Sequence, residues 1–223
     1  MKISVLQFPG TNCEYDTKYA FEQLGCEVEI IWHKEKNIPE DTDLLVIPGG
    51  FSYGDYLRSG AIARFATIMD SVQAYAAKGG KVLGICNGFQ ILLEAGLLPG
   101  AMKRNDSLHF ISKFHTLKVV DNDNAFLSLL KKDEVLNIPV AHHDGNYYID
   151  SLGLKDLEEN GQILLKYCDN NGNVVNMNGS VSNIAGICNK EKNVFGLMPH
   201  PERAIEELLG STDGINMLKG FLQ

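Results

Sequence analysis

The first hundred residues alternate short, almost continuous apolar runs with stretches that carry apolar side chains at helical spacing. The runs that predict strands are 3–8, 27–32, 44–47 and 81–85, and those that predict helices are 16–24, 62–77 and 88–94. Apolar strands that alternate with amphipathic helices form a parallel sheet with helices on both faces. The sequence therefore predicts an α/β fold of three layers around a mostly parallel central sheet.

The second half of the chain is less regular. Its apolar and alternating runs predict strands at 109–120, 135–141, 162–168, 184–188 and 194–198, with a last helix at 214–221. Residues Asp169–Asn173 read Asp-Asn-Asn-Gly-Asn, which is a strong turn signal and favours hairpins in this half. Because no repeat or low-complexity linker separates the halves, we expect one domain, residues 1–223, with an antiparallel insertion.

Composition narrows the partners and the compartment. The net charge is −8, from 20 basic and 28 acidic side chains without a basic run, which argues against nucleic acid and anionic membranes as partners. No stretch approaches membrane-spanning length, and the first apolar run is too short for a signal peptide. The five cysteines are an odd number without a CxxC pair, so neither a disulfide framework nor a zinc site is expected. We expect a reduced, cytoplasmic location.

Cys86 lies in a Gly-x-Cys-x-Gly sequence at the point where a predicted strand meets a predicted helix. This is the cysteine form of the nucleophile elbow, a sharp turn that exposes the side chain at the N-terminus of the next helix. Gly84 and Gly88 would let the two backbones pass closely. The helix N-terminus favours thiolate over thiol and can stabilise an oxyanion. An arbitrary cysteine is more often a buried core residue, but the flanking glycines favour a nucleophile here.

A cysteine nucleophile needs a base, and the base needs a group that orients it. His200 follows the last predicted strand, between Pro199 and Pro201, and Glu202 could hold its imidazole. Alone, a His-x-Glu pair after a strand is more often a surface loop or a structural pair. Together with the elbow it becomes persuasive, because the two signals have independent origins and complete one mechanism.

An oxyanion hole needs two N–H donors. We expect one from Asn87, directly after the nucleophile, and the other from Gly50 in the glycine pair that follows the third strand. Without Cys86, an ordinary turn would explain that pair equally well. Residues 142–144, His-His-Asp, invite a metal interpretation, but adjacent histidines chelate poorly and no second ligand cluster supports them. No metal is therefore expected, and a loop role at the mouth of the site is favoured. The remaining histidines carry no motif and are interpreted as structural: His33, His109 and His115.

These motifs resemble the class I, or triad, glutamine amidotransferases, whose fold is flavodoxin-like. Longer strings resemble more specifically the glutaminase subunits of phosphoribosylformylglycinamidine synthase, and they are Pro48–Ala63 with its Phe-Ser-Tyr-Gly-Asp sequence, Gly10–Glu14, Asn178–Ser180 and Gly196–Arg203. The resemblance covers essentially the whole chain. The Phe-Ser-Tyr-Gly-Asp sequence is much more specific than the triad, which many amidotransferases share.

The resemblance implies a role for each matching position. Cys86 would be the nucleophile, His200 the base and Glu202 its orienting carboxylate, with Gln90 lining the substrate pocket. Gly50 and Asn87 would supply the oxyanion-hole amides. One departure is that the family usually has His-Gly-Glu-Gly where residues 142–145 read His-His-Asp-Gly.

The implied activity is hydrolysis of L-glutamine to glutamate and ammonia through a cysteinyl thioester. The ammonia would serve a partner that converts formylglycinamide ribonucleotide to formylglycinamidine ribonucleotide in purine biosynthesis. The implied partners are a large synthase subunit, which would bind ATP and Mg²⁺, and a small bridging subunit; the chain has no P-loop, and no cofactor of its own is expected.

Two alternatives remain. Another cysteine hydrolase of the flavodoxin-like class would share the elbow but would need neither Gln90 nor the Phe-Ser-Tyr-Gly-Asp sequence. A non-catalytic regulatory subunit would keep the cleft without the reaction, although Cys86, His200 and Glu202 are all present. We also expect the isolated chain to have low activity, because the peptide of a glycine pair can flip at little cost until a partner docks.

Overall fold

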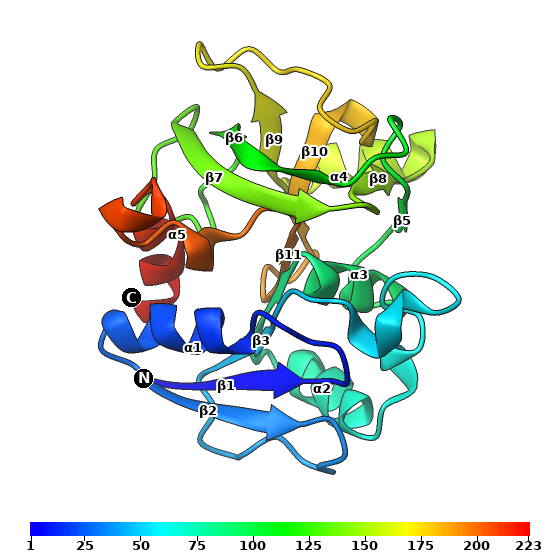
Figure 1. The fold of residues 1–223 in the computed structure, drawn as a ribbon, viewed down its shortest axis with the longest axis vertical. Coiled ribbons are helices and arrows are strands. Elements are labelled where there is room, and N and C mark those ends of the chain that lie inside the picture. The colour runs from blue at the N-terminus through cyan, green and yellow to red at the C-terminus, as the bar shows by residue number, and fades with distance from the viewer.

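The computed structural model describes residues 1–223, and a nine-stranded sheet runs through it (Figure 1). Five strands are parallel: β1 (Lys2–Gln7), β2 (Glu27–Trp32), β3 (Leu44–Ile47), β4 (Lys81–Ile85) and β11 (Val194–Leu197). Four strands continue the sheet in antiparallel order: β6 (Ile111–Val119), β7 (Val135–His142), β9 (Ile163–Cys168) and β10 (Ile184–Cys188). The strand order is β2-β1-β3-β4-β11-β10-β9-β6-β7.

The helices lie between these strands in the chain. They are α1 (Glu14–Gln23), α2 (Ile68–Ala77), α3 (Asn87–Glu94), α4 (Ser151–Glu159) and α5 (Gly214–Lys219). Two short strands, β5 (Ala101–Lys103) and β8 (Asn146–Tyr148), form a separate antiparallel pair. Short 3₁₀ turns are η1 (Ser52–Asp55), η2 (Ala63–Phe65), η3 (Val181–Asn183), η4 (Pro201–Arg203), η5 (Glu207–Leu209) and η6 (Gly220–Leu222).

The α/β class and the antiparallel insertion are confirmed. The insertion between α3 and β11 extends the same sheet from the β11 side, so the parallel half in blue and cyan meets the antiparallel half in green and yellow at β11 (Figure 1). β3, whose four residues are all buried, occupies the position between β1 and β4 that its continuous apolar run predicts.

One predicted helix was wrong, and one helix was not predicted. The stretch 62–77 is not one helix, because Ala66 takes an extended conformation between η2 and α2. As a result Phe65 is 75% exposed and does not share the buried face of Met69 and Val72. The sequence analysis also missed α4, which begins at a clear N-cap where the Asp150 carboxylate accepts the Gly153 N–H at 2.8 Å.

The strands β1, β3, β4 and β11 end at one edge of the sheet, and the loops that follow them meet there. Fifty-five buried residues form one continuous apolar cluster, to which all nine strands of the sheet contribute. Both termini lie on the opposite side, at the left of Figure 1. None of the helices is long and apolar enough to cross a lipid bilayer.

Candidate active site

Cys86 links the end of β4 to the start of α3 in a backbone conformation that side chains rarely adopt, with φ 50° and ψ −103°. Its N–H donates to Leu197 O of the neighbouring β11 at 2.8 Å, which fixes the turn. Strained angles at a non-glycine residue persist only where surrounding contacts enforce them, and they concentrate at functional sites. The geometry is that of the nucleophile elbow predicted from the sequence.

The two glycines beside Cys86 are required by close backbone contacts. A Cβ on Gly88 would lie 1.8 Å from Ile47 O, and a Cβ on Gly84 would lie 2.7 Å from the Gly88 carbonyl carbon. β3, β4 and the first turn of α3 therefore approach more closely than alanine would allow. This contact places Cys86 at the N-terminus of α3, where the first N–H groups lack helical partners.

His200 and Glu202 form the buried pair that their spacing suggests. His200 Nδ1 lies 2.6 Å from Glu202 Oε1, and both residues are only 2% exposed. The His200 backbone N–H donates to Pro139 O of β7 at 2.8 Å, so the antiparallel half anchors the loop after β11. Because His200 Nδ1 is hydrogen-bonded to the Glu202 carboxylate, the other ring nitrogen, Nε2, is available for catalysis. Nε2 has no hydrogen-bond partner.

Cys86 and His200 lie beside each other at one edge of the sheet, although they are 114 positions apart in the chain. Both line the same cavity of about 140 Å³. The point where a Cβ on Gly49 would stand is 2.8 Å from His200 Cε1 and 3.5 Å from Cys86 Cβ. Glycine at position 49 thus leaves room between Cys86 and the imidazole of His200.

The structure also separates the charge states of two buried histidines. Burial lowers the His200 pKa, but the negative charges of Glu202 and Cys86 outweigh it and hold that pKa well above its ordinary value. Burial, followed by the charge on His200, lowers the His142 pKa to about 4. The two pKa values are thus shifted in opposite directions, so His200 holds a proton more readily than His142.

Two loops could supply an oxyanion hole beside Cys86. Gly50 has φ 142°, and a Cβ there would lie 2.7 Å from the Asn12 N, so only glycine fits. The Asn87 side chain accepts the Ser52 N–H at 2.9 Å and thereby ties the loop after β3 to α3. Gly50 thus lines the same cavities as Cys86, and Asn87 directly follows the nucleophile at the start of α3.

Gln90 is 4% exposed and lies one helical turn after Cys86. Its Oε1 accepts the Asn87 amide at 2.8 Å, and its Nε2 donates to Asp144 O at 2.6 Å. It lines a cavity of about 310 Å³ that also contains Cys86 and both Asp55 and Asp144. The expected pocket residue therefore borders the pocket that opens onto the nucleophile.

Sequence reasoning assigned no role to several residues that the structure brings to this edge. Cys13 is 2% exposed, and its Sγ receives the Arg203 Nη2–H at 3.0 Å. Asp55 and Asp144 enter the pocket from the loop after β3 and the end of β7. A usable signal existed for Cys13, because it follows β1 as Gly50 follows β3 and Cys86 follows β4. His143 and Asp144 of the His-His-Asp sequence line the same pocket, together with the buried His142 at the end of β7.

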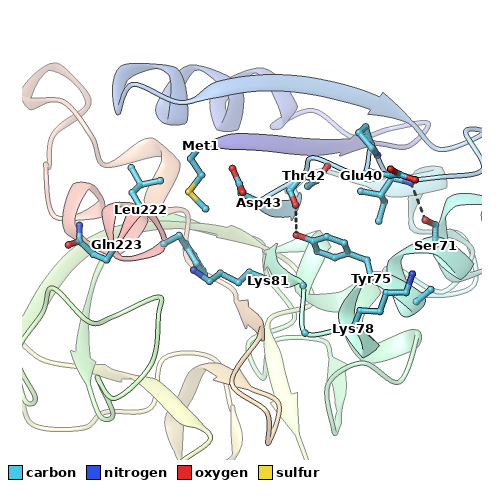
Figure 2. Close-up of a pocket in the computed structure, with 16 residues that line it drawn as sticks. Met1, Glu40, Thr42, Asp43, Ser71, Tyr75, Lys78, Lys81, Leu222 and Gln223 are labelled. Carbon is cyan, nitrogen blue, oxygen red and sulfur yellow. Dashed lines mark hydrogen bonds between the residues drawn. The ribbon is translucent and has the colours of Figure 1, made fainter.

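A larger cavity, of about 890 Å³, lies at the opposite edge of the parallel strands (Figure 2). Met1, Asp43 and Lys81 stand at the starts of β1, β3 and β4 and border it. Tyr75 crosses it and donates a hydrogen bond to Thr42 O at 3.1 Å. It contains neither a thiol nor an imidazole, so the chemistry of the molecule is concentrated in the smaller cavities.

Comparison with known families agrees with this geometry. The CobB/CobQ-like glutamine amidotransferase domain matches residues 1–214. The chain therefore belongs to this family of glutamine amidotransferases, a class of enzyme consistent with the thiol, imidazole and carboxylate described above.

Individual relatives are more specific. The chain is similar to phosphoribosylformylglycinamidine synthase subunit PurQ of Sulfurimonas denitrificans, with 69% identity over 100% of both chains. It is 64% identical to the PurQ subunit of Wolinella succinogenes over 99% of both chains. Among solved structures, PurLQS from Thermotoga maritima matches with a TM-score of 0.89 and 41% identity, covering 99% of this chain and 97% of that one. A Trypanosoma brucei CTPS glutaminase domain, at 13% identity and a TM-score of 0.61, shares the fold.

Proposed function

We propose that this chain is the glutaminase subunit of a phosphoribosylformylglycinamidine synthase and acts as a single domain. Cys86 is the nucleophile, His200 the acid and base, and Glu202 the carboxylate that orients His200. The observation that carries the proposal is the elbow at Cys86 sharing a buried cavity with a histidine that is bonded at 2.6 Å to a carboxylate. High identity to PurQ subunits over the full chain supports the particular synthase.

The reaction follows from these positions. The Cys86 sulfur attacks the side-chain amide carbon of L-glutamine, and the N–H groups of Gly50 and Asn87 receive the negative charge on the amide oxygen. His200 gives its proton to the departing nitrogen as the C–N bond breaks, which releases ammonia and leaves a glutamyl thioester. His200 then takes a proton from water, the hydroxide attacks the thioester, and glutamate leaves.

Glutamine is supported as the substrate by the charges of the 310 Å³ pocket. Asp55 and Asp144 give it a negative wall that suits the α-ammonium group of a free amino acid. Arg58 is committed to Glu94 through two hydrogen bonds of 2.7 Å. Arg104 is 71% exposed at the pocket and forms only a long ion pair with Asp144, 3.9 Å from Nε to Oδ1, so it is the cation more available to the α-carboxylate.

Delivery of ammonia requires a partner, because ammonia released into water is protonated and lost as a nucleophile. We propose a large synthase subunit, which would bind ATP and Mg²⁺, together with a small bridging subunit. The rim of the pocket supports docking, since Tyr56 is 75% and Leu57 82% exposed on the loop after β3. These assignments imply a cytoplasmic enzyme without a cofactor of its own.

The test uses the assembled complex. Cys86→Ala should abolish glutamine-dependent synthesis and leave synthesis from added ammonium salt intact, because only the glutaminase step uses the thiol. Matching the glutamine-dependent rate of the unaltered complex would exclude Cys86 as the nucleophile. Loss of both activities would indicate a disrupted complex, which gel filtration of the assembly would reveal.

A further inference from the structure

Residues Asn178–Ser180, Asn-Gly-Ser, belong to the strings that resemble the family, yet the proposed reaction gives them no role. Asn178 and Ser180 are 2% and 5% exposed, and neither lines the 310 Å³ pocket. Both bind the loop His143–Gly145, which joins β7 to β8 (Figure 1) and whose first two residues line that pocket. Asn178 Nδ2 donates to Gly145 O at 2.7 Å, and Ser180 Oγ donates to the same oxygen at 3.2 Å. The motif therefore binds a pocket loop without entering the pocket.

A second buried asparagine, Asn105, binds the same loop. It is 0% exposed, and its backbone N–H donates to His143 O at 2.9 Å. Its side-chain Oδ1 accepts the Gly145 N–H at 3.1 Å, and its Nδ2 donates to His142 O at 2.9 Å. The N–H and the carbonyl of Gly145 are thus both bound by buried side chains from other segments of the chain.

Close contacts require glycine in both segments. A Cβ on Gly145 would lie 2.2 Å from His142 Nδ1, and a Cβ on Gly179 would lie 2.2 Å from the carboxyl carbon of Asp106. The Asp106 N–H donates to Asn178 O at 3.0 Å. The segment after β5, the Asn-Gly-Ser motif and the loop therefore form one packed network.

The network bears on the substrate through Asp144, whose carboxylate the proposed function places at the α-ammonium group of glutamine. The Asp144 carbonyl and the Gly145 N–H belong to one planar peptide group, so a partner that fixes one of them also fixes the other. Gln90 Nε2 donates to that carbonyl at 2.6 Å, while Asn105 Oδ1 accepts the N–H at 3.1 Å. The orientation of Asp144 in the pocket thus depends on Asn105 and Asn178, which lie outside it.

We propose that Asn105 and Asn178 are positioning residues for glutamine binding. They hold the loop His143–Gly145 in the conformation that presents the Asp144 carboxylate to the substrate, and they touch neither the substrate nor the reacting atoms. A loop that is ordered beforehand binds a ligand without paying the entropy of ordering, so loss of these hydrogen bonds weakens glutamine binding. The role in glutamine binding rests on the proposed function, whereas the order of the loop does not.

The test measures glutamine hydrolysis by the assembled complex with the nearly isosteric variant Asn178→Asp. This variant keeps an oxygen that accepts the Ser180 N–H, at 3.1 Å in the unaltered chain, but loses the N–H donor to Gly145 O. We expect the KM for glutamine to rise about tenfold and kcat to change less than about twofold, because Cys86 and His200 are untouched. An unchanged KM would overturn the proposal.

Asn193→Asp is the matched control. Asn193 is also buried, and its amide also donates to backbone carbonyls, those of Ala76 and Gly80 at 2.8 and 2.9 Å. Because it lies outside the pocket, its substitution should lower the urea midpoint of unfolding as Asn178→Asp does but leave the KM unchanged. An equal rise in KM in both variants would show a general loss of structure and would also overturn the proposal.

A double-mutant cycle shows whether Asn178 acts through Asp144. In an Asp144→Asn chain, Asn178→Asp should raise the KM by less than about twofold, because the carboxylate that it positions is already absent. A tenfold rise in that chain as well would mean that the two residues act independently. If Asn178→Asp does not assemble, Ser180→Ala removes the 3.2 Å hydrogen bond to Gly145 O and should raise the KM roughly threefold.

Hydrogen exchange separates this inference from the proposed function. Without substrate, the amides of Gly145 and Tyr147, which donate to Asn105 and Ser180, should exchange at least about tenfold faster in Asn178→Asp than in the unaltered complex. Equal exchange rates would reject the role of Asn178 in ordering the loop. A complex whose loop is protected but which neither binds nor hydrolyses glutamine would instead reject the proposed function, and with it the role in glutamine binding.

Discussion

The two ends of the parallel strands differ more than any other two regions of the molecule. At the amino ends lies the larger cavity, of about 890 Å³, whose side chains keep ordinary partners, such as Tyr75 on Thr42 O (Figure 2). At the carboxyl ends lie smaller cavities of about 310 and 140 Å³, with a strained cysteine and a buried histidine–glutamate pair. Cavity size and chemical capability are therefore unrelated here.

The direction of the strands explains the difference. Each strand of a β-α unit ends where the next helix begins, so unpaired N–H groups and positive dipole ends collect at the carboxyl edge. Gly50 and Gly88 allow the loops there to approach within contact of one another. The amino edge receives helix C-termini and chain ends and lacks these donors. Variants at matched positions on the two edges can test this account.

The largest effect is expected at Glu202. Glu202→Gln should lower kcat for glutamine hydrolysis roughly a thousandfold, because His200 loses the carboxylate that orients it and holds its proton. Since Glu202 raises the His200 pKa, its removal should also move the pH dependence of kcat/KM toward lower pH. Glu40→Gln makes the same change at the amino-end cavity and should alter neither quantity. An equal loss in both variants would mean that the two edges are not functionally distinct.

The largest difference in stability between the two edges is expected at the close contact of Gly88 with Ile47 O, beneath the nucleophile elbow. Gly88→Ala places a Cβ 1.8 Å from Ile47 O and should lower the free energy of unfolding by about 3 kcal/mol, measured by urea denaturation. Gly79→Ala, after α2 at the amino edge, meets no atom within 4 Å. Gly79→Ala should lower the free energy of unfolding by only about 1 kcal/mol, because alanine disfavours the positive φ of 88° at this position. Similar losses in the two variants would show that the close approach at Gly88 relaxes without strain.

How far the sequence predicts the molecule depends on whether a residue acts through local pattern or through distant contacts. The strands Glu27–Trp32, Leu44–Ile47 and Lys81–Ile85 were predicted to the residue, because a buried parallel strand is a continuous apolar run between turn signals. The helix over 62–77 was wrong, because the extended backbone at Ala66 leaves no mark in the apolar spacing.

The site divides in the same way. The elbow and the His-x-Glu pair could be predicted because each is a local motif at a strand end. The position of Cys13 after β1 was a usable signal, but its contact with Arg203 could not be predicted, because the two residues are 190 positions apart in the chain. The position of Asp144 in the pocket likewise could not be predicted, because it depends on Ser59, which lies on a different loop and donates to it at 2.7 Å. Long-range contacts of this kind are set by the packing of the sheet and not by spacing.

A smaller effect, on the KM for glutamine, is expected at Asp144. Asp144→Asn should raise KM for glutamine about tenfold with little change in kcat, because the carboxylate faces the substrate far from the reacting carbon. The variant should lose its preference for glutamine over glutaramic acid, which lacks the α-ammonium group. Asp43→Asn at the amino-end cavity, where the carboxylate accepts the Lys2 N–H, should keep the KM of the unaltered chain. An unchanged KM in Asp144→Asn would remove the carboxylate from substrate binding.

The smallest effect is a pH-dependent change in stability at Asp55. Burial, and then the charge of Asp144, raise the Asp55 pKa from 3.8 to about 6, whereas Ser59 and Asn87 oppose the shift through hydrogen bonds. A carboxyl whose pKa is raised on folding favours the folded state in its protonated form, so its ionisation destabilises the fold as the pH rises from about 4 to 6.

Because Asp55 is half-buried, solvent screening reduces this cost, and Asp55→Asn should stabilise the chain by about 1 kcal/mol above pH 7. The gain should vanish below pH 4, where the carboxyl is protonated in both states. Urea denaturation at pH 4 and pH 8 measures both values. The amino-edge carboxylate Asp43 accepts the Lys2 N–H at 2.7 Å, and Asp43→Asn should show no such gain at pH 8. A pH-independent gain in Asp55→Asn would mean that repacking, and not charge, separates the two edges.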